Sequence, residues 1–140
     1  MEEHEASTRV RALTPTGDEP TDVGALRGLL DQLGDAKHLP GVRRELIAVF
    51  ERHPEADLGS PGPIVHALEE SPIDEHVDLL ASSLRRRATM MTVWMAERCF
   101  RSKLSAQNRA ELLDALAEAQ REPVSGELAE AIAGALCEYG

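Results

Sequence analysis

The sequence repeats one triplet three times, an acidic residue followed by two large aliphatic residues: Glu45-Leu46-Ile47, Asp78-Leu79-Leu80 and Glu111-Leu112-Leu113. Both intervals between the acids are 33 residues. This length accommodates one helix, a turn and a second helix packed antiparallel to the first, which is the unit of an α-solenoid. The repeat therefore predicts an all-α fold: a short right-handed α-solenoid of antiparallel helix pairs, of the HEAT or armadillo kind.

Proline, glycine and serine residues mark where the helices should begin and end. Proline is tolerated in the first turn of a helix and disfavoured in its interior, so each proline bounds a segment. The best-formed start is Ser71-Pro72-Ile73-Asp74, where a hydroxyl cap precedes a proline and a carboxylate faces the positive end of the helix dipole. About seven helices are expected, at 22–35, 41–53, 62–70, 72–86, 88–103, 105–121 and 125–139.

The first twenty residues differ from the rest of the chain. They are polar, contain two prolines and a glycine, and show no helical period of apolar residues. We therefore expect a mobile or loosely attached arm over 1–20, from which Val10 and Leu13 could still dock on the body. Residues 21–140 are expected to form a single helical-repeat domain, since a chain of this length suits one core.

The expected helix at 88–103 carries apolar side chains around most of its surface, which predicts that it is buried between neighbours. Its polar stripe places Arg98 and Arg101 beside Trp94, the one tryptophan of the chain. Trp94 could be a core residue with Arg98 stacked over its ring. It could also be an anchor for a partner, because tryptophan and arginine are enriched at interface hot spots.

The formal charge of −10 is distributed in blocks. Residues 61–84 hold five acidic residues and no basic one, whereas residues 85–103 hold six basic residues and one acidic residue. A surface dominated by carboxylates repels nucleic acid and anionic lipid and attracts basic proteins. Neither nucleic acid nor a membrane is therefore an expected partner.

Five carboxylates gather around the expected corner between two helices: Glu69, Glu70, Asp74, Glu75 and Asp78. Such a run is often only a solvated corner. It could also be an anionic patch that docks a basic partner. The second interpretation stays open because no basic residue within 61–84 neutralises the patch from inside.

The sequence offers little for catalysis. His66 and Glu69 form half of the motif that carboxylate-bridged metal sites use, and the required second copy is missing. Cys99 and Cys137 lie among apolar residues, so both are expected to be free thiols that face the core. We expect no enzyme activity and no cofactor. No long apolar run and no leader-like segment is present, which predicts a cytoplasmic protein.

The residues also resemble a known family. Thr92-Val93-Trp94-Met95 followed by Arg98, together with Ile64-Val65-His66 and Arg86-Arg87-Ala88-Thr89, resembles the small HEAT-like immunity proteins of bacterial polymorphic and contact-dependent toxin systems. The resemblance covers about residues 62–118. The chain departs from the family pattern at Ala88, where proline is usual, and at Arg101, where asparagine is usual.

The resemblance implies a cytoplasmic, non-catalytic protein that is a monomer until it binds a cognate toxin, expected to be a basic nuclease, in a tight complex. The candidate contact residues are Glu69, Glu70, Asp74, Glu75 and Asp78, with Trp94 and Arg98 as anchors. An alternative is a HEAT-like adaptor or scaffold that binds a peptide or partner protein, since solenoids serve many binding roles. A metal-dependent HEAT enzyme is a third possibility.

Overall fold

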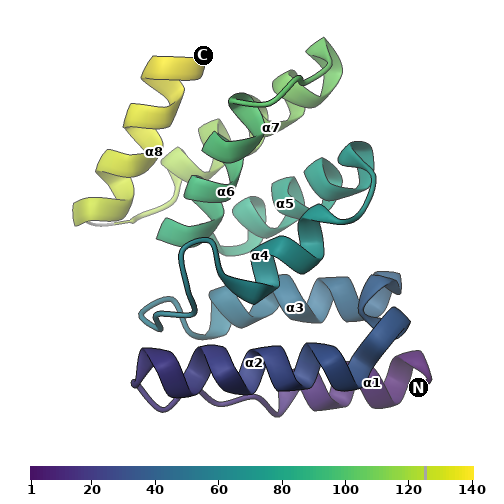
Figure 1. Cartoon of the computed structure of the whole chain (residues 1–140). Helices are drawn as coiled ribbons and strands as arrows, with labels where there is room; N and C mark the ends of the chain where they lie inside the picture. Colours follow the sequence, from purple (N-terminus) through teal and green to yellow (C-terminus); the bar gives the residue numbers. More distant parts are fainter. Residues whose placement is uncertain (125) are drawn as a thin grey trace. The chain divides into compact units, whose positions relative to one another are not determined.

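The computed structural model describes residues 1–124 and 126–140, and every regular element in these residues is a helix (Figure 1). The prediction of an all-α protein is confirmed. The chain divides into two compact units, Met1–Pro72 and Ile73–Gly140. The first unit contains α1 (Glu3–Arg11), α2 (Glu19–Leu33), the 3-10 helix η1 (Gly34–His38), α3 (Pro40–Arg52) and α4 (Gly62–Glu69). The second contains α5 (Ile73–Arg87), α6 (Met90–Phe100), α7 (Ala106–Arg121) and α8 (Gly126–Tyr139).

Helices α2 to α8 begin and end within three residues of the seven expected segments, apart from residue 125, which lies outside the described residues. Local caps explain several of these starts. The Asp18 carboxylate accepts a hydrogen bond from the Thr21 amide (3.2 Å) ahead of α2, and the Ser105 hydroxyl accepts one from the Asn108 amide (3.0 Å) ahead of α7. Each cap satisfies a backbone N–H that has no acceptor within its own helix.

Among the described residues, two helical elements lie beyond the seven expected segments: the 3-10 helix η1, and α1, which residues 3–11 form. The sequence analysis did not expect a helix here, and the mobile or loosely attached arm over 1–20 stays a prediction. Ala6 and Val10 are fully buried, one turn apart on the same face. Two small apolar residues in a nine-residue polar segment give too weak a periodic signal to recognise in the sequence. The expectation of a single domain over 21–140 stays a prediction, since each unit is described by itself.

In the first unit, alternate helices pack against each other: α1 lies on α3, and α2 lies on α4 (Figure 1). Its core is aliphatic and includes fully buried side chains from three helices, such as Leu26, Leu46 and Leu68. The same arrangement holds within the second unit, where α5 lies on α7 and α6 lies on α8. Leu80, Leu84, Leu112 and Leu116 are buried there.

The 33-residue repeat corresponds to the starts of α3, α5 and α7 at residues 40, 73 and 106. The repeated acids Glu45, Asp78 and Glu111 therefore occupy the same position in their helices. In each unit, the acid of the later helix meets an arginine from the helix it packs on. Arg11 of α1 contacts Glu45 at 3.0 Å, and Arg85 of α5 contacts Glu111 at 2.6 Å.

Helix α6 is not buried on all sides as expected. Val93, Met95 and Ala96 lie in the core, but Met90 is 46% exposed and Trp94 is partly exposed. The buried face also includes Thr92, whose hydroxyl and amide form a reciprocal capping box with Thr89. Met90 lies about 200° around the helix from the buried Thr92, which places it on the outer side.

The two cysteines have different environments. Cys99 is buried in α6, whereas Cys137 is exposed on α8, and both are free thiols. The expectation that Cys137 faces the core is wrong. The inner face of α8 is formed by Ile132 and Ala135, and Cys137 lies about 200° around the helix from Ala135.

Candidate partner-binding site

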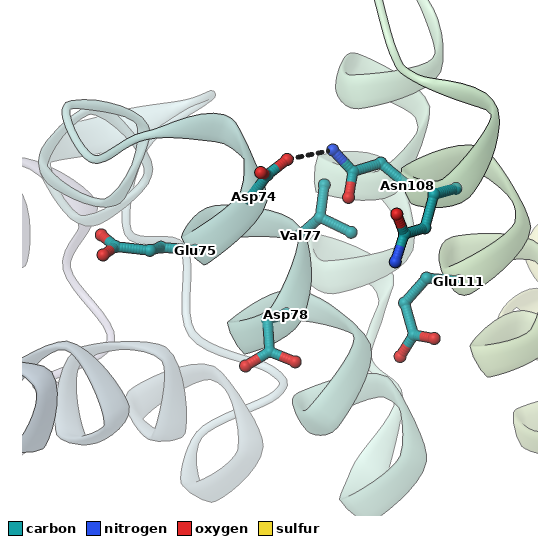
Figure 2. A pocket seen from close by; sticks show the side chains of 7 residues that line it. Asp74, Glu75, Val77, Asp78, Asn108 and Glu111 are labelled. Carbon is teal, nitrogen blue, oxygen red and sulfur yellow. Dashed lines mark hydrogen bonds between the residues drawn. The ribbon is translucent and has the colours of Figure 1, made fainter.

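The second unit has a hollow of about 460 Å³ at the first turns of α5 and α7 (Figure 2). One apolar residue, Val77, contributes to it, and the remaining lining is polar. The lining residues are Asp74, Glu75, Val77 and Asp78 from α5, with Gln107, Asn108 and Glu111 from α7. The hollow thus brings together three of the five predicted contact carboxylates and adds a fourth carboxylate and two amides.

The helical period explains this grouping. Asp74 and Asp78 are four residues apart on α5, and Gln107 and Glu111 are four residues apart on α7, so each pair lies on one face of its helix. Both helices contribute residues near their N-terminal ends. The partial positive charge of a helix N-terminus stabilises nearby carboxylates, so these acids can gather there at low cost.

One hydrogen bond joins the two sides of the hollow. The Asn108 side-chain amide donates to the Asp74 carboxylate across 2.7 Å (Figure 2). Asn108 is only 9% exposed, and its backbone N–H is held by Ser105, so its position is well defined. Figure 2 shows Asp78 and Glu111 extending to the same side of the two helices, while Glu75 points away from α7.

The charges of the hollow are only partly compensated. Arg85 contacts both Glu111 and Glu118, and these two hydrogen bonds raise the pKa of the Arg85 guanidinium above its already high ordinary value. Among the described residues, no arginine, lysine or histidine forms an ion pair with Asp74, Glu75 or Asp78. The α5 side of the hollow therefore carries uncompensated negative charge.

The other two predicted carboxylates, Glu69 and Glu70, belong to the first unit, at the end of α4. Glu70 is held there by two side chains of the same unit. Its Oε1 lies 3.1 Å from the His38 imidazole and 3.4 Å from the Lys37 ammonium. The hydrogen bond from His38 is the main cause that lowers the pKa of Glu70, with Lys37 adding to it. Glu70 thus has a cationic partner, Lys37, whereas Asp74, Glu75 and Asp78 have none among the described residues.

The predicted anchors Trp94 and Arg98 do lie together on α6. The Arg98 guanidinium carbon is 5.4 Å from the centre of the Trp94 ring, which confirms the predicted stacking. Trp94 is not fully buried, so the pair retains some accessible surface. Arg101 does not flank Trp94 as expected. Its Nε donates instead to the Tyr139 hydroxyl (3.2 Å), which raises the pKa of Arg101.

Three lining residues were missed by the sequence analysis: Gln107, Asn108 and Glu111. The sequence did indicate Glu111, because this residue occupies the same repeat position as Asp78. Gln107 and Asn108 had none, since nothing local in the sequence places the first turn of α7 beside that of α5.

The described residues contain no group of three or more histidine, cysteine or acidic side chains that could hold a metal ion. In this same part of the chain, no helix is both long enough and apolar enough to cross a membrane. Comparison of the chain with protein-family models, with curated proteins and with solved structures finds no match.

Proposed function

We propose that this chain is an immunity protein that binds a cognate basic toxin and neutralises it in a tight, non-catalytic complex in the cytoplasm. The observation that carries the proposal is the hollow of the second unit, where Asp74, Glu75 and Asp78 have no cationic partner among the described residues. The resemblance of residues 62–118 to HEAT-like immunity proteins supplies the biological role.

The lining of the hollow suits a basic side chain. An arginine or lysine side chain has an apolar stem and a charged end. Asp78 and Glu111, which extend to the same side, can accept hydrogen bonds from the charged end. Bonds between a guanidinium and carboxylates are stronger than neutral ones and favour arginine when two acceptors are available. A basic toxin could offer several such side chains.

The packing within each unit supports a solenoid of the HEAT kind. In both units the first helix lies on the third and the second lies on the fourth, as expected for stacked helix pairs. In such an arrangement, equivalent helices expose equivalent faces. We therefore propose that, within the second unit, the repeated acids Asp78 and Glu111 belong to one face, which is the face that binds the toxin.

The structure changes how much each predicted contact residue is expected to contribute to binding. Glu75 and Asp78 are exposed and lack cationic partners among the described residues, so they should contribute most to the attraction of a basic protein. Glu70 should contribute less, because Lys37 forms an ion pair with it and His38 donates a hydrogen bond to it. Trp94 with Arg98 remains a proposed anchor, since a stacked pair loses little conformational entropy on binding.

The test combines genetics with kinetics. The candidate toxin is the C-terminal domain of the protein encoded directly upstream of this chain. Coexpression with the wild-type chain should restore growth, and the two proteins should copurify at one-to-one. Association rates are then measured at about 50 and 300 mM salt, where the screening of exposed charges differs most usefully.

The variant Glu75→Lys/Asp78→Lys should slow association by roughly tenfold or more at low salt and by much less at high salt. Its matched control is Glu127→Lys/Glu130→Lys, which makes the same charge change on the exposed face of α8. Equal effects of both variants would show that only net charge matters and would remove the hollow from the proposal. Binding of a basic peptide without protection of growth would favour the adaptor function instead.

A further inference from the structure

Helix α1 docks mainly on α3 and contributes few apolar side chains of its own to that contact. Its buried residues are Ala6, Ser7 and Val10, and its remaining side chains are exposed. Only two of the three buried residues are apolar, and both are small. Burial of these side chains stabilises the docked helix by much less than the leucine-rich contacts stabilise α2 and α3.

Two polar contacts hold the ends of α1 on α3. At one end, the Glu3 carboxylate accepts a hydrogen bond from the Gly41 amide (3.0 Å) in the first turn of α3. The preceding residue, Leu39, provides no side-chain cap, so Glu3 caps α3 from another helix. At the other end, Arg11 contacts Glu45 at 3.0 Å. A further bond, from Arg9 to Gln32 (3.3 Å), reaches α2.

The connection from α1 to α2 is held much more firmly at its far end. Asp22 is 5% exposed, and its carboxylate accepts three hydrogen bonds, from the Thr16 amide (2.8 Å), the Thr16 hydroxyl (2.8 Å) and the Gly17 amide (3.1 Å). Gly17 has a φ of 93°, a value that glycine adopts without strain. The loop is therefore fixed to α2 from Thr16 onward.

We propose that α1 is a strap that opens from α3 as one unit, pivoting at residues 12–15, while the chain from Thr16 onward stays folded. The opening separates Glu3 from Gly41 and Arg11 from Glu45 and uncovers the face of α3 beneath α1. Cooperative segments with few apolar contacts and exposed polar contacts open at a lower free energy than the whole domain. This inference is independent of the proposed toxin binding.

Amide hydrogen exchange of the full chain tests the strap. In the wild type, the amides of α1 should exchange faster than those around Leu26, Leu30 and Leu46, and they should do so together. The amides of Thr16 and Gly17 should remain protected, because both donate to Asp22. Uniform exchange of α1 with α2 and α3 would overturn the proposal.

Two variants and a control locate the contacts that close the strap. Glu3→Ala and Arg11→Ala should each raise the exchange rate of the α1 amides about three- to tenfold, the effect expected for loss of one hydrogen bond. The rates of α2, α4 and the later turns of α3 should not change, whereas Glu3→Ala should also accelerate exchange of the Gly41 amide, which loses its acceptor. Glu2→Ala is the matched control, since Glu2 precedes the same helix and its side chain forms no cap hydrogen bond. The proposal fails if both variants behave like Glu2→Ala, or if they accelerate exchange throughout the first unit.

Discussion

The Asn108 side chain donates a hydrogen bond to the Asp74 carboxylate across 2.7 Å and thereby joins the first turn of α7 to the first turn of α5. This contact lies at the edge of the acidic hollow and involves a residue that is mostly buried. Two physical requirements meet at this contact. The carboxylates must be concentrated, and their mutual repulsion must be kept from separating the helices. The Asn108 amide holds the two helices together through its bond to Asp74. Because the amide is uncharged, it leaves the negative charge of the hollow unchanged.

Replacement of this amide by a carboxylate should destabilise the second unit. In Asn108→Asp the donor is lost and two carboxylates face each other, so unfolding should become easier by about 1–3 kcal/mol at neutral pH. The loss should diminish in acid, because repulsion raises the pKa of one carboxyl and its protonated form can donate again. Urea unfolding at several pH values measures this. Gln107→Glu, an exposed neighbour of equal charge change, should shift stability by less than about 0.5 kcal/mol.

Asp22 should make the stability of the first unit depend on pH. The Thr16 amide, opposed by burial and assisted by the Thr16 hydroxyl and the Gly17 amide, lowers the pKa of Asp22 below its ordinary value of 3.8. A lowered folded-state pKa stabilises the fold above the unfolded pKa, and this contribution is lost as the pH falls through the folded pKa.

The variant Asp22→Asn should therefore be less stable than the wild type at pH 7, and the difference should shrink between about pH 4 and pH 2. Denaturant midpoints across this range measure the effect. Asp31→Asn, on the exposed side of α2, is the control and should show no such dependence. A difference between wild type and Asp22→Asn that stays constant with pH would contradict the assignment.

Arg85 should stabilise the second unit in a salt-dependent way. Its guanidinium contacts Glu111 at 2.6 Å and also Glu118, and all three side chains are partly exposed. Arg85→Gln should cost about 0.5–1 kcal/mol at low salt, the usual range for exposed ion pairs, and less at 0.5 M salt. Thermal unfolding at the two salt concentrations measures this. Arg27→Gln, at an exposed position of α2, should show little effect at either concentration.

The two thiols should react at different rates. Cys137 is exposed and Cys99 is 4% exposed, so a thiol reagent should modify one group per folded chain quickly and the other only after unfolding. Cys137→Ser should abolish the fast reaction, whereas Cys99→Ala should retain it. If both thiols of the folded wild type reacted quickly, Cys99 would be more accessible than its burial in α6 implies, which would contradict this prediction.

The residues that mark the ends of helices explain how much of the fold can be predicted from the sequence. Proline, glycine and serine act on their own local backbone, so the start at Ser71-Pro72-Ile73 could be located within a residue or two. Helix α1 was missed because only Ala6 and Val10 mark its inner face. The outer position of Met90 was missed because apolar residues lie around most of α6, so their pattern does not specify which side faces the core.

The candidate site could be predicted only in part. Asp74, Glu75 and Asp78 lie close together in the sequence, so their proximity in α5 follows from the helical period. The contact of Asp74 with Asn108 joins residues 34 apart, and that of Glu70 with His38 joins residues 32 apart. Such contacts depend on the register between packed helices, which no local pattern specifies. That is why Glu70 and the α5 acids looked equivalent in the sequence.

The pairs Arg11–Glu45 and Arg85–Glu111 each join the repeated acid of one helix to an arginine of the helix it packs on, and in both cases the touching faces are largely aliphatic. Leucine and alanine surfaces can slide past each other by one turn, about 5.4 Å, with little change in buried area. A slip of that size would separate each arginine from its acid. The pairs thus select one alignment among several that hydrophobic packing alone would tolerate, and their removal should produce alternative alignments before it produces unfolding.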